Sequence, residues 1–443
     1  MSQQEPSPPS DCPVAIAPRY HTAEPNEPDV LYDGEAQFQI DGATVKKNAE
    51  VRLRWLPTPH VEIRIADCAM PRPLATPSPD VLLQRRPAPY SVRWTRMSFG
   101  GGTPPPALVG TVGTADLEPD VAMRRLVFHV ANGPKFRGTH VRNATDRQTR
   151  LGRVELTVTP WRIAIDEIAE WQSREAQRKL KDTGGYAITH VGRIEHEDGS
   201  SFRADAVESL RRTIGFLLSF CRGAWAWPLL PVATDAADHD LFSEWQCGRI
   251  AAWQSVPSWF HESLTEGLAI IEPMHRRLND PVWDKPAELA LFWYPICNDA
   301  YHSSVEGAIV LQQAALEMLA WTLLVEDRKA LTISAAKKLN ADGRLRRLFR
   351  ECRIPLDIPS ELAALKSAPN VPPGLDGPGT TIKIRNALAH TTQEKHGMVF
   401  GEDPQYLVEA WSLGQWYLDL VLLWLCDYKG HYVNRLKRDV LLV

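Results

Sequence analysis

The spacing of apolar residues changes along this chain, and that change constrains the fold most strongly. Before about residue 160, short runs such as EVRLRWL (50–56), HVEIRIA (60–66) and RLVFHVA (125–131) carry apolar side chains at every second position. This alternation, with turn residues between the runs, is typical of antiparallel strands. After about residue 259, apolar residues recur at three- and four-residue spacing, which indicates amphipathic helices. The sequence therefore predicts an α+β multidomain protein, with an antiparallel β-rich region followed by an all-α bundle.

Four segments follow from this pattern and from the local composition. Residues 1–30 are rich in Pro, Ser and Glu and are predicted to be disordered. Residues 31–160 are predicted to form the antiparallel β-rich domain, and residues 161–258 a mixed α/β extension of it. Residues 259–443 are predicted to form the helical domain. A chain of 443 residues is too long for one ordinary core, so several domains are expected.

Individual elements can also be predicted. Residues 161–182 are expected to be helical, because acidic residues come early and basic residues late, as the helix dipole favours. Residues 186–205 are expected to form a hairpin that turns at Asp198-Gly199. An amphipathic helix is expected over residues 206–221. The helical domain is expected to contain helices over residues 259–278, 286–300, 303–326, 332–351, 378–391 and 404–428.

Composition indicates where the protein resides. No stretch is long and apolar enough to cross a bilayer, and the N-terminus lacks a basic region followed by an apolar one. The seven cysteines are dispersed without a Cys-x-x-Cys pair, which argues against a disulfide framework and a zinc ribbon. We therefore expect a cytoplasmic protein with no membrane span, no metal site and no cofactor.

Positive charge is concentrated in one segment, although the whole chain has a formal net charge of −4. The segment from Arg328 to Arg353 contains nine Lys or Arg residues and only two acidic residues. One interpretation is a solvated helical face. The other is a phosphate-binding surface, because cations that contact phosphates release counterions and provide most of the non-specific affinity for nucleic acid. In the second case, the side chains predicted to bind RNA are Arg344, Arg346, Arg347 and Arg350.

The most informative motif is RNALAH, residues 385–390. On a helix, Asn386 and His390 lie on one face about one turn apart, and the long side chain of Arg385 can reach the same side. The motif thus combines a permanent cation, an amide and an imidazole that titrates near neutral pH. These groups suit phosphoryl chemistry, because a cation stabilises charge on phosphorus oxygens and a histidine transfers protons.

This motif resembles that of HEPN domains, a superfamily of helical bundles marked by an Arg and, a few residues later, a His, often with Asn after the Arg. The run GAIVLQQAALEMLAW (307–321), with Glu317 among apolar residues, resembles the early helix of these domains. A β-rich region ahead of such a domain resembles the ApeA-type bacterial anti-phage proteins.

The resemblance implies a homodimeric, metal-independent endoribonuclease that acts in anti-phage defence or stress response. Its composite site would lie at the dimer interface of the helical domain. Arg385 would stabilise the transition state, His390 would act as general acid or base, and Asn386 would orient the His or a phosphate. Glu317 would orient or pair with Arg385. The β-rich region would sense a trigger, such as one derived from a phage, or hold the nuclease in check.

Alternatives remain open at this stage. One is a non-catalytic HEPN protein that binds RNA or serves as a scaffold. Another is a toxin whose His-containing motif is modified by a cognate antitoxin. The final helix, residues 406–428, is apolar over more than one stripe. Such a helix either lies at the centre of a bundle or is shared with a partner, and we predict a homodimer through the helical domain.

Overall fold

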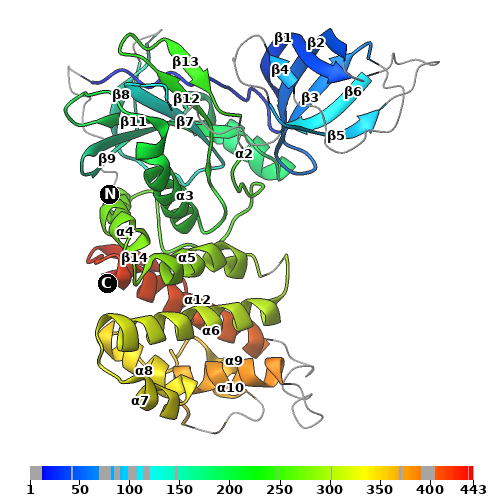
Figure 1. The fold of residues 1–443 in the computed structure, drawn as a ribbon. Helices are drawn as coiled ribbons and strands as arrows, with labels where there is room; N and C mark the ends of the chain where they lie inside the picture. The colour runs from blue at the N-terminus through cyan, green and yellow to red at the C-terminus, as the bar shows by residue number, and fades with distance from the viewer. Residues whose placement is uncertain are drawn as a thin grey trace. The chain divides into compact units, whose positions relative to one another are not determined.

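The computed structural model of the chain divides into two compact units (Figure 1). The first contains residues 1–133, 137–211 and 226–254, and the second contains residues 134–136, 212–225 and 255–443. Antiparallel strands dominate the first unit and helices the second, so the predicted α+β multidomain organisation is confirmed. The structure describes residues 12–40, 43–68, 81–83, 90–97, 107–112, 120–144, 148–245, 247–300, 302–368, 372, 374–390, 405–437 and 439–442.

The first sheet of the β-rich unit is antiparallel throughout and, within the described residues, has the strand order β4-β1-β2-β3-β6-β5. Its strands are β1 (Asp29–Ile40), β2 (Ala43–Arg54), β3 (His60–Ala66), β4 (Val81–Leu83), β5 (Val92–Met97) and β6 (Ala107–Val112). The alternation read from the sequence corresponds to burial. In β3, Val61, Ile63 and Ile65 face the core, whereas Arg64 between them is exposed.

The second sheet of the same unit has the order β13-β12-β7-β11-β10-β9-β8 within the described residues. Its strands are β7 (Arg125–Ala131), β8 (Thr139–Arg142), β9 (Thr149–Val158), β10 (Trp161–Glu167), β11 (Ile188–His196), β12 (Pro228–Thr234) and β13 (Asp240–Ser243). Leu53 and Ile63 of the first sheet belong to the same buried cluster as Val127 and Val191 of the second. The two sheets therefore share one hydrophobic core.

The prediction of a helix over residues 161–182 is wrong for its first part. Residues 161–167 form β10, which pairs with both β9 and β11. Trp161, Ile163 and Ile165 alternate along it, so the period of two, rather than the order of charges, decided the structure. Helices begin only afterwards, with α1 (Ala169–Gln172) and α2 (Arg174–Thr183).

The predicted hairpin over residues 186–205 is also absent from the described structure. The chain does turn at Asp198-Gly199, where Gly199 has a φ of +70°. Beyond the turn, however, Phe202 bridges to Met123, and a 3₁₀ helix (Ala204–Val207) follows. The partners of β11 are β7 and β10, so strand pairing in this sheet depended on tertiary packing.

The segment over residues 12–28 lies along the second sheet, although its composition predicted disorder. Val14 forms a parallel bridge with Arg142. The amide of Ile16 donates to Asp166 Oδ2 at 2.7 Å, and the amide of Arg19 donates to Nε2 of the buried His129 at 2.9 Å. Buried polar acceptors of the sheet thus order a segment that has little apolar surface of its own. Residues 1–11 of the predicted disordered segment lie outside the described residues.

These contacts make His129 a pH-sensitive part of the β-rich unit. Burial, which penalises the charged imidazole, lowers the pKa of His129 from 6.5 to about 4. In the unfolded chain the ring takes up a proton near pH 6.5, so folding becomes less favourable as the pH falls from 6.5 towards 4. Above pH 6.5 this contribution to stability is fully present.

We expect the stability advantage of the wild-type protein over His129→Gln to shrink by up to about 3 kcal/mol across that pH range, at ~1.4 kcal/mol per pKa unit. Urea unfolding of both proteins at a series of pH values measures the difference. Asp29, whose pKa is raised to about 7 by burial, contributes in the opposite direction, but it is present in both proteins and cancels. A difference that does not vary with pH would contradict the assignment.

The helical unit is built around its last helix, α12 (Gln405–Leu425), of whose 21 residues sixteen are buried. Among the described residues, its other α-helices are α3 (Glu208–Arg222, from residue 212 onward), α4 (Ile271–Leu278), α5 (Asp284–Asn298), α6 (Val305–Trp321), α7 (Ile333–Lys338), α8 (Ala341–Glu351), α9 (Ala363–Lys366) and α10 (Gly377–Ala389). A hairpin of β14 (His431–Asn434) and β15 (Asp439–Leu442) ends the chain. The apolar surface of α12 is therefore used within the chain.

Two predicted helices are interrupted. The helix expected over residues 332–351 is divided at Leu339 into α7 and α8. Helix α6 continues as a π-helical turn (Thr322–Asp327). By length and composition, the helix Val305–Asp327 could cross a membrane, but 61% of its most apolar window is buried inside the protein, as in the core helix of a soluble protein.

Candidate active site

Helix α10 carries the RNALAH motif and has a well-defined start. The Asp376 carboxylate caps it by accepting a hydrogen bond from the amide of Gly379 at 3.0 Å. Arg385 and Asn386 are half-buried in its last turns. His390 is the C-cap residue with an exposed side chain, and its amide donates to the carbonyl of Asn386 at 3.0 Å. The histidine side chain is thus exposed at the end of the helix, and residues 391–404 lie outside the described residues.

A single carboxylate joins the motif to two other helices. Glu317 of α6 forms an ion pair through Oε1 with the guanidinium of Arg385 and, through Oε2, with Arg344 Nη2 at 3.3 Å. The three side chains are 19–22% exposed, so the pairs are partly shielded from water. Arg344 also donates to the carbonyl of Leu339 at 2.6 Å. The structure thus brings Arg385 and Glu317 together and fixes the guanidinium in position.

Arg346 has a structural role at the start of α10. Its Nε and Nη2 atoms bind the two carboxylate oxygens of Asp376 at 2.6 and 2.9 Å, and its Nη1 binds Asp342 at 2.6 Å. These hydrogen bonds, above all those that Arg346 donates to Asp376, raise the pKa of Arg346. Because Asp376 is also the N-cap of α10, this bidentate contact ties α8 to the helix that carries the motif.

The four arginines predicted to bind RNA therefore differ. Arg344 and Arg346 are half-buried and engaged by carboxylates of the same chain, whereas Arg347 and Arg350 on α8 are exposed. Only the second pair presents guanidinium groups to solvent from this helix.

The sequence analysis missed the Arg344–Glu317 pair and the Arg346–Asp376 clamp. Both join residues far apart along the chain, so no local spacing revealed them. One local signal was available, because Asp376 followed by Gly377 and Pro378 is a typical start of a helix. It would have identified Asp376 as a cap, but not as the partner of Arg346.

A metal site would need several His, Cys, Asp or Glu side chains close together, and the described parts of the chain can be judged on this point. In those parts, no three His, Cys, Asp or Glu residues are arranged so that they could hold a metal ion. The candidate site consists of Arg385, Asn386, His390 and Glu317, which lie on α10 and α6.

Comparison with known proteins places the chain in a family. The YopA central domain matches residues 118–256, and the YopA C-terminal domain matches residues 280–442, which include the candidate site. The SPbeta prophage-derived uncharacterized protein YopA of Bacillus subtilis (strain 168) is 32% identical over 326 residues, or 73% of this chain and 71% of that protein. No solved structure matches the chain. The chain therefore belongs to the YopA family.

Proposed function

We propose that this protein is a metal-independent endoribonuclease of the HEPN type. The observation that carries the proposal is the arrangement at the end of α10, where Glu317 holds the Arg385 guanidinium and His390 is exposed just beyond the last turn. A positioned cation and an exposed imidazole near the same end of one helix are groups that can cleave a phosphodiester when no metal takes part.

The substrate must then supply the nucleophile, and RNA does so through its 2′-hydroxyl. His390 would take a proton from this hydroxyl or give one to the leaving 5′-oxygen, because imidazole populates both forms near neutral pH. Arg385 would offset the charge that develops on the phosphorus oxygens. Asn386, one residue further along α10, would orient the phosphate or the imidazole.

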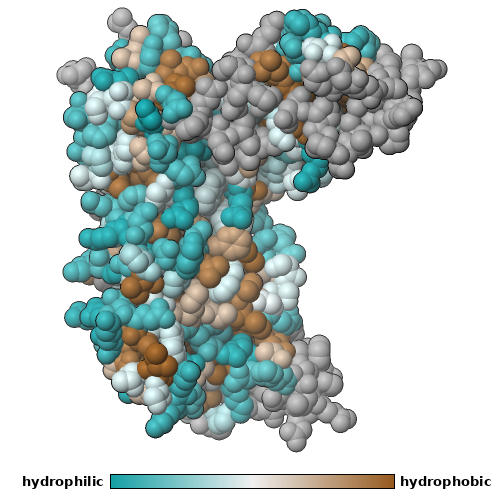
Figure 2. Space-filling model, in the orientation of Figure 1, coloured by the Kyte–Doolittle hydropathy of each residue, from teal (hydrophilic) through white to brown (hydrophobic). Residues whose placement is uncertain are grey.

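The proposal includes a homodimer formed through the helical unit in the cytoplasm. Since α12 is buried within the chain, a second copy would have to use other apolar surfaces. Figure 2 shows hydrophobic side chains over α5 and α6 on the viewed face, and Leu289 of α5 is 39% exposed. Light scattering at micromolar concentration tests this assembly, and a monomer would argue against a composite site.

A role in anti-phage defence is part of the same proposal, with the β-rich unit as the sensor of a phage-derived trigger or as the surface that an antitoxin binds. The relative from Bacillus subtilis is named as derived from the SPbeta prophage. This origin is compatible with competition between phages, in which a nuclease that acts on RNA would be useful.

One observation favours a second candidate, a non-catalytic RNA-binding or scaffold protein. The Arg385 guanidinium is already paired with Glu317. A paired guanidinium offers less charge to a transition state, and Glu317 would have to release or share it. In a binding module the same pair would only hold α10 against α6.

The chemistry of the products tests the proposal. Purified protein with a labelled single-stranded RNA should yield 2′,3′-cyclic phosphate and 5′-hydroxyl ends, in the presence of EDTA. DNA and 2′-O-methyl RNA of the same sequence should resist cleavage, because both lack the free 2′-hydroxyl. Cleavage that depends on added magnesium or leaves 5′-phosphates would exclude this mechanism. Binding of RNA without any cleavage would favour the second candidate.

The two exposed arginines of α8 give a further prediction. If Arg347 and Arg350 contact phosphates, their double replacement by Gln should make the slope of log affinity against log salt shallower by about 1.4, since each contact to a single strand contributes about 0.7. The matched control is Arg276→Gln with Lys285→Gln, which removes two other exposed charges from the helical unit. Fluorescence anisotropy at several salt concentrations measures both slopes. If the slope for the Arg347 and Arg350 double variant equals that for the control, the two arginines belong to a solvated face that does not contact phosphates.

A further inference from the structure

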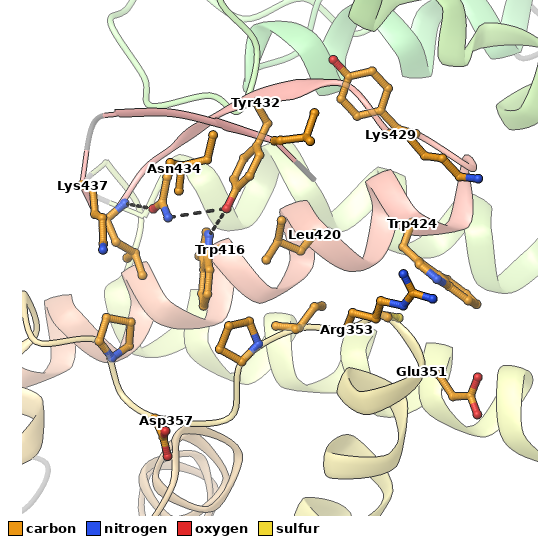
Figure 3. Close-up of a pocket in the computed structure, with 18 of the residues that line it drawn as sticks. Glu351, Arg353, Asp357, Trp416, Leu420, Trp424, Lys429, Tyr432, Asn434 and Lys437 are labelled. Atoms are coloured by element: carbon orange, nitrogen blue, oxygen red, sulfur yellow. Dashed lines mark hydrogen bonds between the residues drawn. The ribbon is translucent and has the colours of Figure 1, made fainter.

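A cavity of about 1000 Å³ lies in the helical unit, separate from the candidate active site (Figure 3). Its walls are α12, residues 351–361 and the hairpin of β14 and β15. None of the residues that line it belongs to the RNALAH motif or to the cluster around Glu317. Its size is at the upper end of the range for pockets that enclose cofactor-sized molecules.

One wall is a row of apolar side chains on α12. Trp416, Leu420 and Trp424 follow one another at four-residue spacing, so they lie on the same face of the helix (Figure 3). The buried Trp416 is fixed by a hydrogen bond from its Nε1 to Tyr432 Oη at 3.2 Å. Trp424 is only half-buried, so part of its indole is available to a ligand. Such a ring can stack on a planar heterocycle.

Cations occupy the end of the cavity at Trp424. Figure 3 shows Arg353 and Lys429 on either side of this indole, and Arg328 lines the cavity as well. Among the described residues, no carboxylate lies within ion-pair distance of these three cations.

The carboxylates of the cavity wall are occupied or turned away. Glu361 pairs with Lys437 at 3.3 Å, and Asp427 pairs with Arg276 at 3.4 Å. Glu351 and Asp357 direct their carboxylates away from α12 (Figure 3). The lining carries four cations and four carboxylates, but within the described residues Arg353 and Lys429, at the Trp424 end, form no ion pair.

Arg353 also has an unusual backbone conformation. Arg353 follows the last turn of α8 with a φ of +57°, and the next amide, that of Ile354, closes the helix by donating to the carbonyl of Phe349 at 2.7 Å. Glycine is the usual residue at such a position, because a side chain is disfavoured there. The helix dipole favours a cation near this end, but any position in the last turn would supply it without a left-handed backbone. An arginine here therefore has a cost for the fold, as does Asp427, the other residue of the cavity wall with a positive φ.

We propose that this cavity binds a nucleotide, either free or as one unit of a single strand. Its base would stack on Trp424, and its phosphate would bind Arg353 and Lys429. A purely apolar ligand would leave the cations unpaired, and a small inorganic anion would leave the aromatic row uncovered. A nucleotide satisfies both features, because it joins a planar ring to an anion.

The test measures binding of the full-length protein to each of AMP, GMP, CMP and UMP, and to a 2′-O-methyl RNA decamer that cannot be cleaved. Arg353→Gly removes the guanidinium and places the preferred residue at the left-handed position, so the melting temperature should not fall. The affinity for at least one probe should fall at least about tenfold, as expected for a lost charge-assisted hydrogen bond. Trp424→Leu should weaken the same probe.

The matched control is Asp427→Gly. Asp427 lines the same cavity and has a φ of +53°, but its replacement removes a carboxylate instead of a cation. Its affinity should stay within about threefold of the wild type, because the exposed pair with Arg276 contributes little. If Arg353→Gly lowers the affinity for a mononucleotide, the ligand is a free nucleotide. If it lowers the affinity for the decamer alone, the ligand is one unit of a single strand. Wild-type protein that binds no probe, or Arg353→Gly that binds as well as wild type, would overturn the proposal. Since nothing is cleaved in this assay, its result is independent of the proposed nuclease activity.

Discussion

Replacement of His390 by Ala is expected to slow RNA cleavage at least about a hundredfold, the usual scale for loss of a general acid or base. The side chain is exposed at the end of α10, so its removal should leave the melting temperature unchanged. His302→Ala is the matched control, because His302 is also an exposed histidine of the helical unit and lies outside the motif. A rate loss shared by both variants would indicate a general effect of histidine removal and would contradict the assigned role.

Arg385→Ala should slow RNA cleavage by a similar factor. A cation that faces the transition state typically raises the rate a hundredfold or more, which corresponds to about 3 kcal/mol of activation free energy. The fold should tolerate the change, because Glu317 keeps its second partner, Arg344, at 3.3 Å.

Glu317→Gln separates the two candidate functions. In a nuclease whose Arg385 must be positioned, it should lower the rate without abolishing RNA binding. A binding module does not cleave RNA, so in that case wild type, His390→Ala and Arg385→Ala should all show no cleavage.

The second large effect concerns stability. Arg435, in the turn between β14 and β15, inserts a guanidinium that is only 3% exposed against the fully buried carboxylate of Asp419, with contacts of 2.6 and 3.0 Å. The Tyr294 hydroxyl donates to the same carboxylate at 2.6 Å, and Arg435 donates to Asn298 Oδ1 at 2.9 Å. Arg435→Met should cost about 3–5 kcal/mol, because it leaves a buried charge without its partner.

The double variant Asp419→Leu with Arg435→Met should lose less stability than Arg435→Met alone, since no unpaired charge then remains in the interior. Urea unfolding followed by tryptophan fluorescence measures both. A double variant that is the less stable of the two would show that the pair itself, rather than an orphaned carboxylate, dominates. The hairpin that Arg435 anchors also forms one wall of the cavity, so Arg435→Met should weaken nucleotide binding as well.

Part of this fold could be read locally. The run RLVFHVA predicted the strand that became β7 with the same bounds, and HVEIRIA predicted β3 in the same way. In β3, alternating burial produces a periodic pattern that needs no knowledge of the partner strand. In β7, every residue after Arg125 is buried, so its bounds were predicted correctly although its burial does not alternate. The prediction for residues 161–167 was wrong, because this short apolar run is followed by a true helix. The segment therefore carries both the alternation of a strand and the charge order of a helix. Only the pairing of β10 with β9 and β11 decided between them.

The motif shows the same division at the level of chemistry. The sequence by itself determined that Arg385, Asn386 and His390 lie together at the end of one helix, because their spacing is local. It also determined that positive charge is concentrated near α8. Only the tertiary structure decided which cations are available, since Glu317 and Asp376 lie far from Arg344 and Arg346 along the chain and meet them only when α6, α8 and α10 pack. Likewise, the apolar length of α12 left a buried helix and an interface helix equally acceptable, and its enclosure by the rest of the unit decided for burial. Local spacing fixes which residues share a face, whereas the partner of a charged or apolar side chain depends on contacts between distant segments.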